Sequence, residues 1–224
     1  MGSETVFLFD LDGTLVDSVY QHVLAWKDAL DREGIALSVW RIHRKIGMSG
    51  GLFTNQLLRE TGMEISADRV DLLRRYHAEA FLRLAGQVRP LPGAMDLLAT
   101  LTDGAVPWAI ATSGRMETAA SNLASLGVDP AVTAVVTRDD VKYAKPDPDL
   151  FLAAAARIGA NIEAAVVVGD SIWDMLAARR CRALGVGLLS GGYGQEELER
   201  AGAIRVYEDP ADLLEHLDEV GGRR

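Results

Sequence analysis

The sequence predicts an α/β protein with a Rossmann-like, open, mostly parallel sheet flanked by helices, and with a helical insert near the N-terminus. Short apolar runs alternate with helical stretches along most of the chain, which is typical of βαβ units with right-handed crossovers. The runs are continuously apolar, as expected of strands buried on both faces. One long interval without such a run predicts the insert.

The expected strands are the β-rich or apolar runs at 5–9 (TVFLF), 106–111 (VPWAIA), 132–137 (VTAVVT), 164–169 (AAVVVG) and 184–189 (LGVGLL), with a weaker candidate at 204–207 (IRVY). Helical stretches separate them, at about 93–102, 115–126, 148–158, 171–181, 195–201 and 210–219. This order predicts an open sheet with helices on its faces.

The insert is expected to be helical. From Val16, apolar residues recur at helical spacing, and further helical runs follow at about 38–46, 50–61 and 66–85. The segment QVRPLPGA (87–94), with two prolines and a glycine, is expected to return the chain to the sheet. The predicted division is therefore a core of residues 1–15 plus 89–224 and an inserted helical domain of residues 16–88.

Composition excludes several classes of protein. Among 224 residues, 49% are apolar and 25% are charged, which is ordinary for a soluble globular protein. The net charge of -9 argues against a nucleic-acid partner and means that an anionic substrate needs a local positive feature, such as a metal ion. No signal-like segment and no apolar run long enough to span a bilayer is present in the sequence, so no membrane partner is expected.

Cys181 is the only cysteine, so no intrachain disulfide can form, and a reducing, cytoplasmic location is expected. It follows a helical run and is expected to be a small buried apolar side chain. Whether the protein is a monomer or a homodimer stays open at this point.

Polar side chains follow the strands at the points where the strands end. Ligands of open α/β sheets bind beyond the carboxyl ends of the strands, so these side chains are expected at one rim. They are Asp10 and Asp12 after the first strand, Thr112, Ser113 and Gly114 after the second, Lys145 in the loop KYAKPDPD (142–149), and Asp170 and Asp174 after strand 164–169.

The chemistry of this rim favours magnesium and a phosphorylated substrate. Asp10 and Asp170, with Asp174 as a further candidate, offer hard oxygen ligands without histidine or cysteine, which suits Mg²⁺ rather than zinc. Magnesium binds through a few carboxylates together with substrate phosphate. Lys145 and the metal would offset the repulsion among the carboxylates, and Thr112 with nearby backbone N–H groups could hold phosphoryl oxygens.

The two aspartates that lie one residue apart are expected to divide the chemistry. Asp10 can attack phosphorus and form an aspartyl phosphate. The turn at Gly13 frees Asp12 to protonate the leaving oxygen and later to take a proton from the attacking water.

Four segments carry a family resemblance: DLDGTLVDS (10–18), ATSG (111–114), AKPDP (144–148) and GDSIWD (169–174). In order and spacing they resemble the four motifs of the haloacid dehalogenase-like hydrolase superfamily, and the insert resembles its small α-helical cap. The resemblance covers essentially the whole chain. It implies a Rossmann-like core with a mobile cap, Mg²⁺ dependence, and hydrolysis of phosphate monoesters through an aspartyl phosphate.

The resemblance also implies roles for single residues. Asp10 would be the nucleophile and a metal ligand, and Asp12 the acid–base that binds metal through its backbone carbonyl. Asp170 would complete the metal site, and Asp174 would support it or join it. Thr112 and Lys145 would bind the phosphoryl group, with Ser113 and Gly114 beside them. The dehalogenase and phosphonate-cleaving branches lack the second aspartate, so the presence of Asp12 argues against both.

The cap is expected to set specificity. The segment YQHVLAWKDAL (20–30) resembles the first cap helix of β-phosphoglucomutase-like members. His22 either helps to gate the acid–base or lies on the cap surface. Lys27 either reaches substrate or packs its stem while its ammonium reaches water.

The segment IGMSGG (46–51) resembles the substrate-specificity loop of the cap, which makes Gly47 and Ser49 candidate substrate contacts. In the mutases an arginine that grips a second phosphate follows the serine, and here Gly50 takes its place. Arg44 or Lys45 could substitute for that arginine.

The sequence therefore favours a magnesium-dependent phosphatase acting on a small phosphorylated metabolite, either a sugar phosphate or a phosphoglycolate-like acid. The alternative is a β-phosphoglucomutase-like sugar-phosphate mutase, which returns the phosphoryl group to product. A third hypothesis is a non-catalytic binding or regulatory protein with a dormant site.

Overall fold

The computed structural model of the chain describes residues 5–48, 50–62 and 66–222. Six strands form an open sheet in the order β5-β4-β1-β6-β7-β8, and all its neighbouring pairs are parallel. The strands are β1 (Val6–Phe9), β4 (Trp108–Ala111), β5 (Val135–Val136), β6 (Ala165–Gly169), β7 (Leu184–Leu188) and β8 (Ala203–Tyr207). Each overlaps an expected strand, and the weaker candidate at 204–207 is the edge strand β8. The predicted fold class is confirmed.

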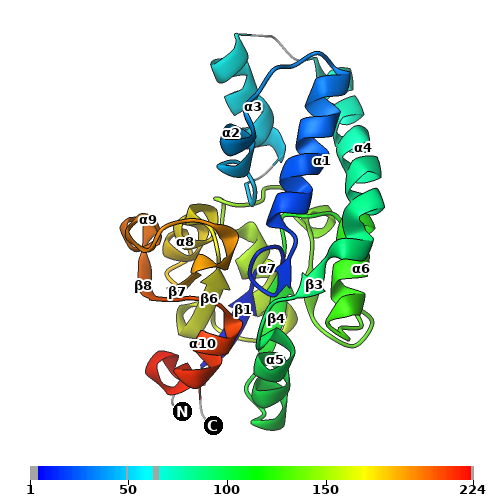
Figure 1. Cartoon of the computed structure of the whole chain (residues 1–224). Helices are drawn as coiled ribbons and strands as arrows, with labels where there is room; N and C mark the ends of the chain where they lie inside the picture. The colour runs from blue at the N-terminus through cyan, green and yellow to red at the C-terminus, as the bar shows by residue number, and fades with distance from the viewer. Residues whose placement is uncertain (1–4, 49, 63–65, 223–224) are drawn as a thin grey trace.

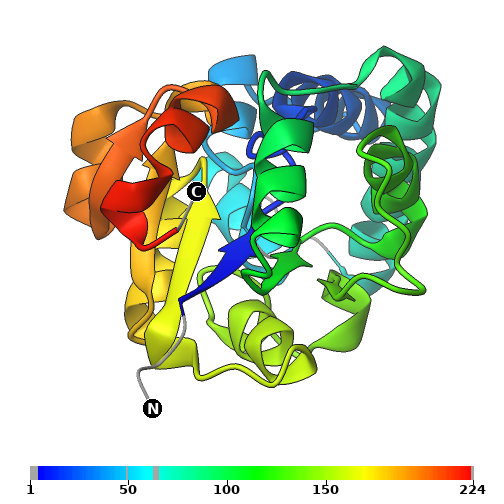
Figure 2. The same ribbon diagram turned by 90° about the horizontal axis from the view of Figure 1, so that it is seen from below.

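Helices cover both faces of the sheet (Figure 2). Successive residues of a strand point to opposite faces, so Phe7 and Phe9 of β1 pack in one apolar cluster and Val6 and Leu8 in another. The first cluster takes in side chains of α5 (Ala94–Asp103), α6 (Met116–Ser125) and α10 (Pro210–Glu215). The second takes in side chains of α7 (Asp149–Arg157) and α8 (Ile172–Arg180), while α9 (Gln195–Ala201) packs beside β8.

Strand β1 lies where the chain changes direction across the sheet. From β1 the strand order runs to β4 and β5 on one side and to β6, β7 and β8 on the other. Loops that leave neighbouring strands in opposite directions open a crevice at such a point. The ends of β1, β4 and β6 therefore frame the place where a ligand is expected.

The insert is helical, as predicted, and lies beyond the carboxyl ends of the strands (Figure 1). It consists of α1 (Val19–Arg32), α2 (Val39–His43), α3 (Gly50–Thr61) and α4 (Ala67–Leu84), which together we call the cap. The cap has its own apolar cluster, which includes Val23, Leu30 and Leu73. Trp173 of the core is packed against this cluster, so cap and core share an apolar contact.

A short ribbon at the base of the cap was not predicted. Strand β2 (Val16–Asp17) pairs antiparallel with β3 (Arg89–Pro90). The expectation that Val16 begins the helical pattern is wrong: Val16 is fully buried in the core cluster, and α1 begins only at Val19. The ribbon joins the two ends of the insert, and the domain boundaries at residues 15/16 and 88/89 stay a prediction.

Cys181 is buried at the end of α8, as expected. Its sulfur lies 3.3 Å from the carbonyl oxygens of Ala177 and Ala178, and burial raises the pKa of the thiol, so this cysteine is a packing residue. Among the helices of the described residues, none has both the length and the apolar character needed to cross a membrane.

Candidate active site

The loop after β1 places two aspartates at the floor of the crevice. Asp10 follows the last residue of β1 and keeps the strand direction, since its N–H donates to Val168 of β6. The chain then turns at Gly13, whose φ of +85° is a conformation that favours glycine. A Cβ on Gly13 would lie 2.6 Å from Asp170 Oδ2, so the turn also needs glycine for space.

Lys145 links two of the carboxylates. Its ammonium forms an ion pair with Asp10 and lies 2.7 Å from Asp174 Oδ1, and the lysine side chain is fully buried. Burial alone would lower the pKa of Lys145, but Asp10 and Asp174 raise it above its usual value. Lys145 is therefore a permanently charged cation beside the predicted nucleophile.

Asp174 is held by the first turn of its own helix. Its Oδ2 accepts hydrogen bonds from Ser171 N at 3.1 Å and Ser171 Oγ at 2.5 Å, which is a capping box at the start of α8. The other oxygen faces Lys145. This geometry makes Asp174 a support for Lys145 and leaves it within 4.8 Å of oxygen atoms of the predicted metal ligands Asp10 and Asp170.

Asp170 lies at the end of β6, where two loops close over it. Its Oδ1 accepts a hydrogen bond from Thr14 Oγ1 at 3.0 Å. On the other side is Gly191, and a Cβ at that position would overlap the Asp170 carboxylate. Ser190, next to this glycine, donates to the Gly13 carbonyl at 2.6 Å and ties the two loops together. The pocket for the Asp170 carboxylate is therefore shaped by glycines.

Lys145 balances only part of the negative charge of the three buried carboxylates. Asp10, Asp170 and Asp174 each offer an oxygen within 4.8 Å of the others, and Lys145 is the cation beside them. Burial raises the pKa of Asp10 to about 7 even beside Lys145, and Asp174 and Asp12 add to this rise. Burial, followed by the nearby Asp174 and Asp10, raises the pKa of Asp170 well above its usual range. A divalent cation would favour the ionised form of these carboxylates, and their oxygen atoms are the ligands that hard cations prefer.

Asp12 has different surroundings, although it is only two residues from Asp10. Its Oδ1 accepts hydrogen bonds from Ser18 Oγ at 2.6 Å and Asn122 Nδ2 at 2.9 Å, and lies 3.2 Å from His22 Nε2. Burial alone would raise the pKa of Asp12. The His22 ring and the hydrogen bonds instead lower this pKa to about 2. The pKa of Asp10 is thus raised and that of Asp12 is lowered, although the two residues are only two positions apart. Pairs of carboxyl groups with oppositely shifted pKa values are typical of acid–base sites.

His22 belongs to a histidine pair inside the cap. Its Nδ1 lies 3.1 Å from Nε2 of His77 on α4, and its ring stacks on Phe81 with centroids 3.9 Å apart. Burial and the nearby His22 lower the pKa of His77 well below its usual value, so His77 is neutral. An ionised Asp12 can only accept, so His22 Nε2 donates to it, and His77 pairs with the remaining nitrogen.

The loop after β4 faces the two aspartates. Thr112 Oγ1 lies 3.5 Å from Asp12 Oδ2 and accepts a hydrogen bond from Gly114 N at 2.9 Å. Ser113 Oγ is buried without a hydrogen-bond partner among the described residues. The predicted phosphate contacts therefore lie together beside Asp10 and Asp12, with an available hydroxyl among them.

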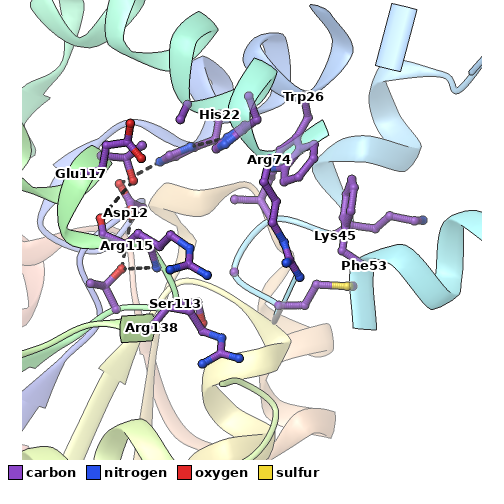
Figure 3. Close-up of a pocket in the computed structure, with 18 of the residues that line it drawn as sticks. Asp12, His22, Trp26, Lys45, Phe53, Arg74, Ser113, Arg115, Glu117 and Arg138 are labelled. Carbon is purple, nitrogen blue, oxygen red and sulfur yellow. Dashed lines mark hydrogen bonds and ion pairs between the residues drawn. The ribbon is translucent and has the colours of Figure 1, made fainter. Parts of the chain in front are cut away.

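A cavity of about 470 Å³ separates cap and core at this point. Figure 3 shows side chains of both parts turned into it. Its lining includes Asp10, Asp12, Thr112, Ser113 and Gly114 from the core, and His22, Trp26, Gly47, Phe53, Arg74 and His77 from the cap. This volume is in the range of pockets that enclose small metabolites.

The structure separates the predicted cap residues into three groups. His22 and Gly47 line the cavity. Lys27 does not: its ammonium pairs with Asp31 one turn along α1, so the stem-packing alternative describes it better. Ser49 lies outside the described residues.

The two cations considered as substitutes at Gly50 already have partners. Arg44 pairs with Glu197 of α9 and stacks on Tyr193 with its guanidinium carbon 4.0 Å from the ring centroid. Lys45 lines the cavity wall, but its ammonium lies 2.7 Å from Glu60 and it is buried.

Several residues of the site were not predicted. Ser18 is inside the quoted first motif and so carried a signal in the sequence. Asn122 is a buried amide in α6, a helix with several other polar residues, so its sequence position did not single it out. His77, Arg74 and Arg138 carried no signal, because only the packing of α4 and of the loop after β5 brings them to the cavity.

A family model described as haloacid dehalogenase-like hydrolase matches residues 5–182. This match covers well over half of the chain and includes all four strand-end segments. The chain belongs to the haloacid dehalogenase-like hydrolase family. The predicted family is thereby confirmed, and with it the prediction that the chain is an enzyme of the hydrolase class.

Known proteins match this hydrolase over most of its length. It is 30% identical to a phosphoglycolate phosphatase of Caulobacter vibrioides, over 92% of this chain and 87% of the relative. It is 35% identical to hexitol phosphatase A of Escherichia coli, over 80% and 82%. Among solved structures, a hydrolase from Pseudomonas syringae superposes with a TM-score of 0.96 at 62% identity, over 98% of this chain and 100% of that one.

Proposed function

We propose that this hydrolase is a magnesium-dependent phosphatase that removes the phosphoryl group of a small phosphorylated metabolite through an aspartyl phosphate on Asp10. The observation that carries the proposal is the cluster of Asp10, Asp170, Asp174 and Lys145 at the floor of a cavity large enough for a metabolite. Both similar phosphatases act on small phosphorylated compounds by name, which supports the same reaction class.

In the first step, an oxygen of Asp10 attacks phosphorus and the ester bond to the leaving oxygen breaks. Lys145 and Thr112 hold phosphoryl oxygens, and the leaving oxygen takes a proton from Asp12. In the second step, Asp12 takes a proton from water, the water oxygen attacks phosphorus, and the bond to Asp10 breaks. Phosphate leaves, and both carboxyl groups return to their initial states.

Asp10, Asp170 and the Asp12 carbonyl would hold Mg²⁺, with Asp174 beside them. The bound cation supplies positive charge that favours the ionised carboxylates and the phosphoryl oxygens. Lys145 alone does not compensate these carboxylates, as the raised pKa values of Asp10 and Asp170 show.

Hydrolysis is favoured over the mutase reaction because, among the described residues, neither of the two cations considered as substitutes for the arginine that is missing at Gly50 is free. Arg44 faces Glu197 and Lys45 faces Glu60. A second phosphate gripped at the specificity loop is the feature that the mutase hypothesis needs, and this loop does not offer it. The dormant-site hypothesis is disfavoured because the four motif segments (10–18, 111–114, 144–148 and 169–174) all keep their reactive side chains, and these side chains lie close together.

The test is phosphate release from a panel of phosphate esters with MgCl₂, against an Asp10→Asn control. We expect Mg²⁺-dependent release that the Asp10→Asn variant lacks, because an amide does not attack phosphorus. With a hexose 1-phosphate as substrate, formation of the 6-phosphate isomer instead of free phosphate would show the mutase. An absence of turnover above the control would favour the dormant-site hypothesis.

The remaining partner assignments stay predictions. A cytoplasmic location, the absence of nucleic-acid and membrane partners, and the choice between monomer and homodimer rest on the sequence arguments above. Size-exclusion chromatography with light scattering measures the oligomeric state directly.

A further inference from the structure

Among the described residues, four arginines line the cavity, and three of them, from three different elements, point into the same part of it; the fourth is Arg75 of α4. Arg74 belongs to α4 of the cap, Arg115 precedes α6, and Arg138 follows β5. Figure 3 shows their guanidinium groups turned toward one region, with Ser113 beside the two core arginines. In a chain with a net charge of -9, such a concentration of positive charge is a local exception.

Arg138 carries the least compensated charge of the three. Its guanidinium donates to the carbonyl oxygens of Val141 and, at 3.1 Å, Lys142, and no carboxylate of the described residues pairs with it. Carbonyl oxygens satisfy N–H donors but do not neutralise the positive charge. The backbone N–H of Arg138 donates to Gly114 at 2.9 Å, which fixes this arginine against the loop that bears Ser113.

Arg74 pairs with an exposed carboxylate, and this weak ion pair leaves its guanidinium able to bind a ligand. It lies 2.9 Å from Asp71, one turn back on α4, and the Asp71 side chain is 71% exposed. An ion pair this exposed contributes little, on the order of 0–1 kcal/mol. An anion enclosed in the cavity would interact more strongly with Arg74, because it would be shielded from water on more sides.

Ser113 lies beside the arginines and lines the cavity. Its hydroxyl oxygen is inaccessible to solvent and has no hydrogen-bond partner among the described residues. Buried polar atoms are nearly always paired, so a rotation of this side chain toward the cavity would give the hydroxyl a partner on a bound ligand.

We propose that Arg74 and Arg138 form a second anion subsite, so that the preferred substrate carries another anionic group, a carboxylate or a second phosphate, besides the phosphoryl group that is transferred. Arginine suits this role because its planar guanidinium binds carboxylate and phosphate through paired hydrogen bonds. The subsite joins an arginine of the cap to one of the core in the cavity that Gly47 of the predicted specificity loop also lines. The inference rests on the phosphatase function proposed above.

The test compares phosphate esters that differ only in the distal group. In the carboxylate arm, 3-phosphoglycerate is compared with glycerol 3-phosphate, which has a hydroxymethyl group in place of the carboxylate. In the phosphate arm, fructose 1,6-bisphosphate is compared with fructose 1-phosphate. The ratio of kcat/KM within each pair is measured by phosphate release for the wild-type protein and for the variants Arg74→Gln, Arg138→Gln and Arg83→Gln.

Arg83→Gln is the matched control. Arg83 lies on the same helix as Arg74, but it pairs with Asp28 at 3.0 Å on the outer side of the cap and does not line the cavity. The neutral member of each pair also serves as a folding control, because its turnover does not need the subsite.

We expect the wild-type protein to prefer the anionic member of at least one pair by about tenfold or more, and the arm that shows this identifies the distal group. Arg74→Gln and Arg138→Gln are expected to remove most of this preference while the neutral ester keeps its rate, and Arg83→Gln is expected to keep the preference. A wild-type ratio near one in both arms, or a ratio that both glutamine variants leave unchanged, would overturn the subsite while the phosphatase function stands. An absence of phosphate release from every ester would overturn both proposals.

Discussion

The ring of His22, on the first helix of the cap, lies 3.2 Å from the carboxylate of Asp12 in the core. This contact places a cap side chain on the group that we propose as acid–base, and together with the hydrogen bonds from Ser18 and Asn122 it lowers the pKa of that group to about 2. In this arrangement Asp12 is ionised, which is the state that takes a proton from water in the second step. The first step requires a proton on Asp12, so either His22 supplies it or the contact lengthens when substrate binds.

Replacement of Asp12 by asparagine tests the acid–base role. The amide can accept the hydrogen bonds of Ser18 and Asn122 but cannot exchange a proton at neutral pH, so we expect kcat to fall by roughly 10²–10⁴-fold. The loss should be smaller for p-nitrophenyl phosphate, whose leaving oxygen needs no proton. Asp17→Asn, at an exposed position of the short strand β2, is the control. A wild-type rate in Asp12→Asn would show that another group moves the proton.

The pairing of His22 with His77 predicts a second effect on turnover. His77→Leu leaves the His22 Nδ1 atom without its partner 3.1 Å away, and we expect kcat to fall by roughly tenfold, the effect of about 1.4 kcal/mol, with little change in KM. His77→Gln restores a side-chain hydrogen-bonding group and is expected to recover most of the rate.

Both His77 variants lose the stacking of this ring on Trp26, whose centroid is 4.3 Å away, so their comparison isolates the hydrogen bond. The measurement is a steady-state kinetic comparison at several pH values, since a change in the pKa of Asp12 alters the pH profile whereas a simple packing defect does not. Equal losses in the leucine and glutamine variants would contradict a positioning role.

The pKa shifts at the floor of the cavity predict how magnesium and pH act together. An aspartate whose folded pKa is raised from 3.8 to about 7, as for Asp10, keeps its proton in the folded state over a range where the unfolded chain has lost it. The free energy of unfolding of the metal-free protein therefore falls as pH rises through this window. A cation reverses the effect, because it favours the ionised carboxylates and competes with protons.

We accordingly expect MgCl₂ to raise the melting temperature more at pH 8 than at pH 6. The check is a thermal melt with and without MgCl₂ at constant ionic strength. Asp170→Asn is the control and is expected to lose most of the increase. A magnesium effect that is the same at both pH values, or larger at pH 6, would argue that the cation binds elsewhere.

The sequence predicted both the arrangement of the sheet and the residues at the floor of the site, and one physical reason explains both predictions. Asp10, Thr112, Lys145 and Asp170 follow strands that are buried on both faces, and the carboxyl ends of parallel strands meet at one rim. Their proximity depends on topology alone, and the structure places them together.

The features that depend on packing between elements were not predictable. The ribbon of β2 and β3 is too short to produce a periodic pattern. His77 and Arg74 reach the cavity because of how α4 lies against α1 and the core, which no local spacing encodes. Lys27 was ambiguous because a helical stripe shows which residues share a face and not which of them faces the ligand.

Gly191 provides the sharpest test of the carboxylate cluster. The Cβ of an alanine at this position would overlap the Asp170 carboxylate, whose other side is held by Thr14 and by the turn at Gly13. Since Asp170 has no free space to move into, we expect Gly191→Ala to displace its oxygen atoms and weaken Mg²⁺ binding by at least tenfold, with a corresponding rise in the MgCl₂ concentration needed for half-maximal activity. Gly194→Ala is the matched control in the same loop, because its Cβ would lie 3.5 Å from Glu197 Oε2, an ordinary contact.

The two alanine variants separate the metal site from general damage to the loop. Neither glycine has a positive φ, so backbone strain does not distinguish them. If Gly191→Ala keeps its fold, as judged by circular dichroism, and regains activity at high MgCl₂, the loss arises from displaced ligands. A Gly191→Ala variant with a wild-type requirement for magnesium would mean that Asp170 does not hold the ion, and the assignment of the cluster as the metal site would have to be abandoned.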